Sequence, residues 1–172
     1  MPKNPRAMIV FPTGQTASQN DKYFDVFSTY ITNESIKASV VVYPKDLTKI
    51  LSNAATLTKR TSLVPVPITD AFSGTADFPY ALKIMFSTII RSATEKLHIV
   101  TSGGTTKIGN LAVLAGNLAE KFGLEVKYLW AARDKHGIYQ INPMPKIRLK
   151  EAAEFDIRTD PDGSVVVEYA LN

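Results

Sequence analysis

The chain has 172 residues, enough for one domain with a continuous hydrophobic core that needs no stabilising metal or disulfide. It contains no cysteine, which excludes a disulfide scaffold, a cysteine-based zinc site and a cysteine nucleophile. The net charge of +4 is too small and too scattered for binding duplex DNA and suits a small polyanion better.

Short apolar runs alternate with amphipathic stretches up to residue 132. The runs are typical of buried parallel strands, and the stretches carry apolar residues at the three- and four-residue spacing typical of helices. The first run has only about six apolar residues, too few for an export signal or a membrane span, so we expect a cytoplasmic protein. We expect strands at 7–11, 36–43, 62–68, 97–100 and 124–131, and helices at 21–32, 47–57, 79–89 and 108–122.

This alternation predicts a doubly wound, Rossmann-like α/β fold, in which a mainly parallel sheet is covered by helices on both faces. Pro65 and Pro67 place their strand at an edge of the sheet, because both remove amide donors from the same side of the strand. After residue 132, two β-like runs flank a turn at 159–164 and predict a C-terminal β-hairpin. We therefore expect one domain over 1–172, with its α/β core at 7–132 and an extension at 133–172.

Two polar loops follow predicted strands and contain glycine and hydroxyl side chains. Thr13, Gly14, Gln15 and Thr16 follow the first strand, and the sequence Ser-Gly-Gly-Thr-Thr-Lys at 102–107 follows the fourth. Ligands of open parallel sheets bind beyond the carboxyl ends of the strands, where the strand order reverses. We therefore expect the two loops to lie side by side across one ligand site.

The loop at 102–107 has the chemistry of a phosphate site. Gly103 and Gly104 let backbone amides approach an anion, and the helix that follows presents its positive end. Side-chain donors are available from Ser102, Thr105, Thr106 and Lys107. Neither the dinucleotide pattern G-x-G-x-x-G nor the triphosphate pattern ending in Gly-Lys-Ser/Thr is present. The alternative is a tight turn in which Thr105 caps the helix and Lys107 lies in solvent.

A strand, the loop at 102–107 and an Ala/Leu-rich helix together resemble the second signature of the CRISPR-associated Rossmann-fold (CARF) domain, and the loop at 13–16 resembles the first. The resemblance implies the CARF fold and recognition of a cyclic oligoadenylate by a two-fold homodimer. Small members that lack an effector domain are often ring nucleases, which cleave this messenger in type III CRISPR antiviral defence.

Cleavage of such a ring needs no metal or cofactor if a ribose 2′-hydroxyl attacks the neighbouring phosphate. On this hypothesis Lys107 stabilises the developing charge, while Ser102 and either Thr13 or Thr16 hold the phosphate; Ser102 and Thr13 are the further expected catalytic residues. His136 follows the fifth strand and could protonate the leaving oxygen. The expected ligand-binding set is Gly14, Gln15, Thr16, Gly103, Gly104, Thr105, Thr106, Asn110, Arg133 and His136.

Two other functions fit the same residues. One is a non-catalytic sensor of cyclic oligoadenylate that acts through a partner, and the other is an unrelated protein that binds a small nucleotide or sugar phosphate. Three further residues are expected to be structural rather than functional: His98 in an apolar strand as a core or interface residue, and Tyr128 and Trp130 as core residues.

Overall fold

The computed structural model describes residues 6–14, 22–68, 78–92, 94–102, 104, 106–133, 135, 139–143, 146–150, 156–163 and 165–170. By their internal contacts these residues form two compact units, one ending at Ile141 and one starting at Asn142. Each unit is described by itself. No helix in the described ranges is long and apolar enough to cross a membrane.

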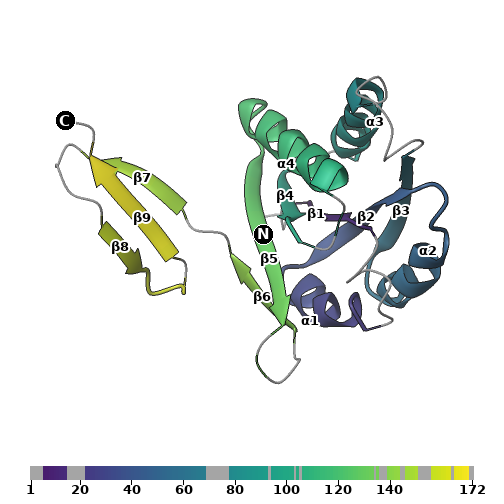
Figure 1. Cartoon of the computed structure of the whole chain (residues 1–172), viewed down its shortest axis with the longest axis horizontal. Helices are drawn as coiled ribbons and strands as arrows, with labels where there is room; N and C mark the ends of the chain where they lie inside the picture. The colour runs from purple at the N-terminus through teal and green to yellow at the C-terminus, as the bar shows by residue number, and fades with distance from the viewer. Residues whose placement is uncertain are drawn as a thin grey trace, which may run out of the picture. The chain divides into compact units, whose positions relative to one another are not determined.

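The first unit is built on a six-stranded sheet with the order β3-β2-β1-β4-β5-β6 (Figure 1). Strands β1 to β5 pair in parallel. The strands are β1 (Ala7–Pro12), β2 (Ile36–Pro44), β3 (Ser62–Ile68), β4 (Lys96–Val100), β5 (Glu125–Arg133) and β6 (Tyr139–Pro143). The predicted α/β class and the five predicted strands are confirmed.

Helices cover both faces of this sheet, as predicted. On one face, α1 (Asp25–Asn33), α2 (Lys49–Ala54) and the 3₁₀ helix η2 (Ala55–Lys59) pack on Phe11, Val41 and Leu129. On the other face, α3 (Phe78–Arg91) and α4 (Thr106–Lys121) pack on Val10, Val42 and Ile99. This arrangement explains the continuous apolar runs of β1, β2 and β4, because these strands bury side chains on both faces of the sheet. Gly123, with a φ of +86°, follows α4 where the helix is expected to end.

The proline-containing strand lies where the sequence predicts it. Strand β3 is at one end of the strand order and pairs only with β2. Pro65 and Pro67 are aligned with Val41 and Tyr43 of β2, and both prolines are exposed. Their missing amide donors therefore belong to the open edge of the sheet, where no partner strand needs them.

The second unit is a three-stranded sheet with the order β7-β9-β8. Its strands are β7 (Lys146–Lys150), β8 (Asp156–Thr159) and β9 (Val165–Ala170). The predicted hairpin is confirmed, since β8 and β9 are antiparallel and Gly163 has a φ of +82° in the turn between them. Two features differ from the prediction: β7, parallel to β9, was not expected, and the extension begins at residue 142 because β5 and β6 continue the first sheet.

Candidate functional site

The strand order reverses between β1 and β4. From β1 the chain adds β2 and β3 on one side of the sheet, and then β4 and β5 on the other side. Strands β1 and β4 are neighbours and parallel, so both end at the same edge of the sheet (Figure 1). The loops that begin at Thr13 and Thr101 therefore leave the sheet at its topological switch point, which is the usual ligand position in this fold class.

The loop at 102–107 touches the end of β1, the strand from which the loop at 13–16 leaves the sheet. A Cβ atom built on Gly104 would lie 3.0 Å from the Cβ atom of Pro12 and 3.1 Å from its carbonyl carbon. Only a glycine lets the backbone of one loop come this close to the end of β1. Four residues of these two loops lie outside the described residues: Gln15, Thr16, Gly103 and Thr105.

We expect Gly104→Ala to lower the free energy of unfolding by about 1 kcal/mol or more, because the added methyl group meets Pro12 backbone atoms that cannot rotate away. Gly109→Ala is the matched control: Gly109 lies in α4 with no atom within 4 Å of the added methyl group. There, alanine should stabilise the helix by up to about 1 kcal/mol. Urea unfolding of both variants measures the difference, and equal effects would contradict the close contact.

Thr13 has a structural role in this loop. Its side chain is fully buried, and its hydroxyl donates a hydrogen bond of 2.6 Å to the carbonyl oxygen of Val42. The Thr13 amide donates to the same oxygen at 2.9 Å. Both groups extend the contact between β1 and β2 beyond the last strand residue. We therefore assign Thr13 to positioning the loop rather than to catalysis, and Gly14, which is also buried, follows it at the switch point.

Ser102 is anchored from two sides. Its hydroxyl oxygen accepts a hydrogen bond of 3.0 Å from the amide of Ala131 in β5, and its carbonyl oxygen accepts one of 2.9 Å from the hydroxyl of Tyr23. Because the Ser102 hydroxyl acts as an acceptor here, its own hydrogen can still be donated to a ligand. Tyr23 was not among the predicted site residues, since nothing in the sequence links two positions 79 residues apart.

Helix α4 begins at Thr106, within the loop at 102–107, so its positive end lies close to the switch point. Lys107, its second residue, is half-buried. Together with Asn110, Val113 and Leu114, Lys107 lines a hollow of about 410 Å³. The polar groups in the lining of this hollow are the Lys107 ammonium and the Asn110 amide, both of which are donors suited to a phosphate group.

The loop after β5 contributes less to the described site. Arg133 is the last residue of β5, at the same edge of the sheet as the two loops, but only its backbone is described. His136 lies outside the described residues, and of Thr106 only the position at the start of α4 is described. The predicted roles of these three side chains remain predictions.

Two aromatic predictions have different outcomes. His98 is a core residue, as predicted: it is fully buried, and its Nδ1 atom lies 2.8 Å from the hydroxyl of Tyr30 in α1. Burial, with a smaller effect of Lys96 and Lys127, lowers the pKa of His98 to about 4, so the side chain is neutral at pH 7. Trp130 was expected in the core, but it is 51% exposed, two residues along β5 beyond the partly buried Tyr128.

Comparison with known proteins adds the following. No family model matches the chain, and no curated protein matches it. The solved structures that match include the crystal structure of a KaiC-like protein from the hyperthermophilic archaeon Pyrococcus horikoshii OT3. It is 12% identical, with 96% of this chain and 90% of that chain covered, and its TM-score is 0.33.

Proposed function

We propose that the switch-point crevice binds a cyclic oligoadenylate and that the protein is a ring nuclease. The observation that carries this proposal is the contact of Gly104 with the end of β1 at the reversal of strand order, where α4 begins and Lys107 is its second residue. Backbone amides, the Ser102 hydroxyl and one lysine form a donor set suited to phosphodiesters. The loop sequences, which resemble CARF signatures, favour a cyclic oligoadenylate over other phosphate esters.

Two copies of the chain are needed to surround such a ring. One copy offers one described lysine at the crevice, whereas a cyclic tetra-adenylate carries four phosphates related by symmetry. A two-fold homodimer presents the same patch twice and so makes equivalent contacts on both sides of the ring. The messenger is made and removed inside the cell, so this function places the protein in the cytoplasm as part of antiviral defence.

Cleavage requires only positioning and charge stabilisation. A ribose 2′-hydroxyl attacks the adjacent phosphorus, the bond to the 5′-oxygen breaks, and the products are a 2′,3′-cyclic phosphate and a 5′-hydroxyl. The proton lost from the 2′-oxygen is balanced by the proton gained at the 5′-oxygen. Lys107 stabilises the charge that grows on the phosphoryl oxygens, and Ser102 orients the phosphate by donating its hydroxyl hydrogen.

A specific observation also favours a second candidate, a sensor that binds the ring without cleaving it. The Thr13 hydroxyl hydrogen is already donated to Val42, and the Ser102 oxygen already accepts from Ala131. Hydroxyl groups fixed in this way can hold a ligand, but they are poorly placed to take up a proton from it. In a sensor, Lys107 would contribute to binding only.

Incubation with labelled cyclic tetra-adenylate in the presence of EDTA separates these functions. We expect a linear product that ends in a 2′,3′-cyclic phosphate. Binding without product would support the sensor instead. Neither binding nor product would contradict both functions and favour a protein that recognises another small nucleotide or sugar phosphate.

A further inference from the structure

The only tryptophan of the chain is exposed next to the candidate site. Trp130 is 51% exposed near the carboxyl end of β5, although a side chain of this size is mostly covered in folded domains. The residue after it, Ala131, donates the amide hydrogen bond that holds the Ser102 hydroxyl oxygen. The exposed indole therefore belongs to the residue just before the backbone group that anchors the loop at 102–107.

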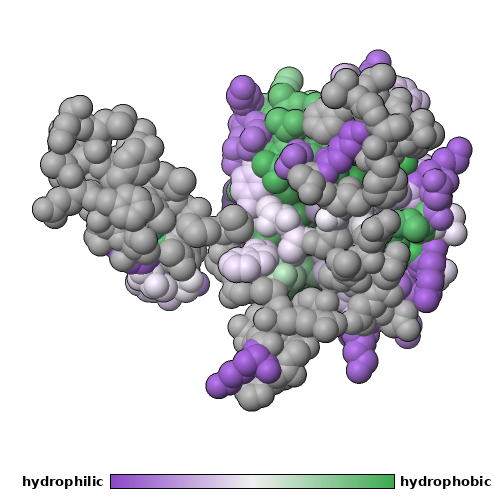
Figure 2. Space-filling model, in the orientation of Figure 1, coloured by the Kyte–Doolittle hydropathy of each residue, from purple (hydrophilic) through white to green (hydrophobic). Residues whose placement is uncertain are grey.

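Trp130 lies on the same face of the sheet as α4. Side chains alternate between the two faces of a strand, so Trp130 faces the same way as Val126 and Tyr128, which pack on the core beneath α3 and α4. Figure 1 shows β5 running on past α4 toward its carboxyl end, where none of the drawn helices lies in front of it. Figure 2 shows pale side chains of intermediate hydropathy along β5, beside the hydrophobic ones over α4. Trp130 is exposed because α4 covers only the first part of β5.

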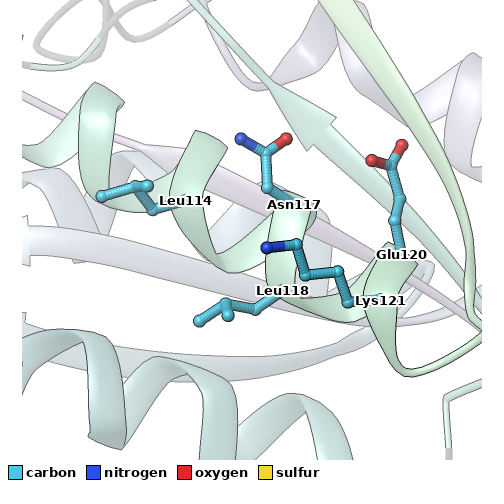
Figure 3. A pocket seen from close by; sticks show the side chains of 5 residues that line it. All are labelled: Leu114, Asn117, Leu118, Glu120 and Lys121. Carbon is cyan, nitrogen blue, oxygen red and sulfur yellow. The ribbon is translucent and has the colours of Figure 1, made fainter.

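Tyr128 marks the place where α4 and β5 are in contact. Its hydroxyl donates a hydrogen bond of 2.7 Å to Oδ1 of Asn117, and a Cβ atom built on Gly116 would lie 2.8 Å from the same hydroxyl oxygen. Burial, with a smaller effect of Glu120, raises the pKa of Tyr128 to about 12, so the hydroxyl keeps the proton that it donates. Figure 3 shows Asn117 and Glu120 leaving α4 on the opposite side from Leu118. The side of α4 that carries Gly116, Asn117 and Glu120 therefore faces β5.

Nearer the switch point, the same side of α4 is open. Gly109 lies about two helical turns before Gly116 and so close to the same side of the helix. No atom of a described residue lies within 4 Å of a Cβ atom built on Gly109. The hollow of about 410 Å³ that Lys107 and Val113 help to line belongs to this part of α4. The space that Tyr128 fills at Gly116 is therefore unfilled at Gly109, close to the start of the helix.

We propose that Trp130 is the platform on which one adenine base of the bound ring stacks. The inference rests on the proposed function, because the base belongs to a nucleotide whose phosphate is held by the loop at 102–107 and Lys107. Phosphate donors beside an exposed aromatic ring are the combination with which proteins hold unpaired nucleotides. Stacking uses the flat face of a base and not its hydrogen-bonding edge. Trp130 therefore contributes affinity and orientation rather than the choice of adenine.

The fluorescence of the natural chain tests this directly, because all tryptophan emission comes from Trp130. A base stacked on the indole quenches its emission. Cyclic tetra-adenylate, with excitation at a wavelength that adenine does not absorb, should lower the emission directly after mixing. The decrease should saturate at the ligand concentration at which calorimetric binding saturates. Inorganic tripolyphosphate, which carries negative charge but no base, should leave the emission unchanged.

Substitution of Trp130 gives a second measurement by calorimetry. Trp130→Leu should weaken ring binding by about five- to a hundredfold, the range found when a stacking aromatic side chain is removed. Trp130→Phe keeps an aromatic face and should retain most of the affinity. Phe122→Leu is the matched control, because it removes a ring that is 68% exposed at the end of α4 away from the switch point. This control should leave the affinity unchanged.

The outcomes separate this inference from the proposed function. If the ring binds, either unchanged Trp130 emission or full affinity in Trp130→Leu would overturn the inference and leave the proposed function intact. Equal quenching by tripolyphosphate would also overturn it, because that anion has no base to stack. If the ring does not bind, adenosine triphosphate is the second probe. Quenching by this nucleotide, with loss of affinity in Trp130→Leu, would support the stacking platform and contradict the ring as ligand, whereas quenching by neither probe would overturn both.

Discussion

Lys107→Ala is expected to reduce ring cleavage at saturating ligand by about ten- to a thousandfold, the range found when one preorganised charge-stabilising donor is removed. Ring binding should weaken much less. The ground-state phosphate keeps its contacts to backbone amides and to Ser102, whereas the additional negative charge appears only on the way to the transition state. Single-turnover cleavage and equilibrium binding of cyclic tetra-adenylate measure the two effects separately.

Lys83→Ala is the matched control, because it removes one positive charge from an exposed position on the neighbouring helix α3. Lys83→Ala should change neither the rate of ring cleavage nor the affinity for cyclic tetra-adenylate. If Lys107→Ala cleaves normally once saturated, Lys107 supplies only binding energy that is equal in the ground state and the transition state. If neither binding nor cleavage changes, Lys107 does not reach the ligand.

The second large effect is on the way in which the free energy of unfolding depends on pH. The pKa of His98 is lowered from 6.5 to about 4, first by burial and then by Lys96 and Lys127. In the unfolded chain the imidazole takes up its proton near pH 6.5, and each proton bound there favours unfolding. The free energy of unfolding should therefore be highest above pH 6.5 and fall by roughly 3 kcal/mol as the pH drops to 4.

His98→Asn should flatten this slope, measured by urea unfolding at several pH values between 4 and 7. His136→Gln, which removes the only other histidine of the chain, is the control and should keep it. Two carboxylates pair with Lys96 and are present in both variants: Glu34 lies 3.9 Å and Glu125 lies 3.0 Å from the Lys96 Nζ atom. The difference in slope between the two variants gives the contribution of His98. Equal slopes would contradict the assignment of the pH dependence to this residue.

The sequence predicted most of the first sheet because local patterns determine it. Runs of buried aliphatic residues mark β1, β2, β4 and β5, and two prolines mark β3 as an edge strand. Strand β7 was missed although its five residues alternate between charged and apolar, as in half-buried strands, because the run is short; its parallel pairing with β9 depends on tertiary structure. Such pairing leaves no local signal.

For the candidate site, the residue types predicted where the site lies in the sheet but not the role of each side chain. Both loops leave the sheet at the expected place because the switch point follows from strand order, and Gly104 lies against the end of β1 there. The hydroxyl of Thr13 donates to the carbonyl oxygen of Val42 because of the register of β1 against β2. This register pairs Pro12 with Val42 and so brings Thr13 next to that carbonyl. Likewise, the exposure of Trp130 depends on how far along β5 the side chains pack against the core. Neither property is visible in a loop or strand sequence alone.

The stoichiometry of ring binding tests the central claim most directly, namely that two switch-point crevices hold one cyclic oligoadenylate. Calorimetric titration of the chain with cyclic tetra-adenylate in EDTA is predicted to give one ring per two chains. It should also show a loss of affinity in Gly104→Ala, whose added methyl group presses on Pro12 between the loops. One ring per chain, or no binding heat at all, would contradict the claim.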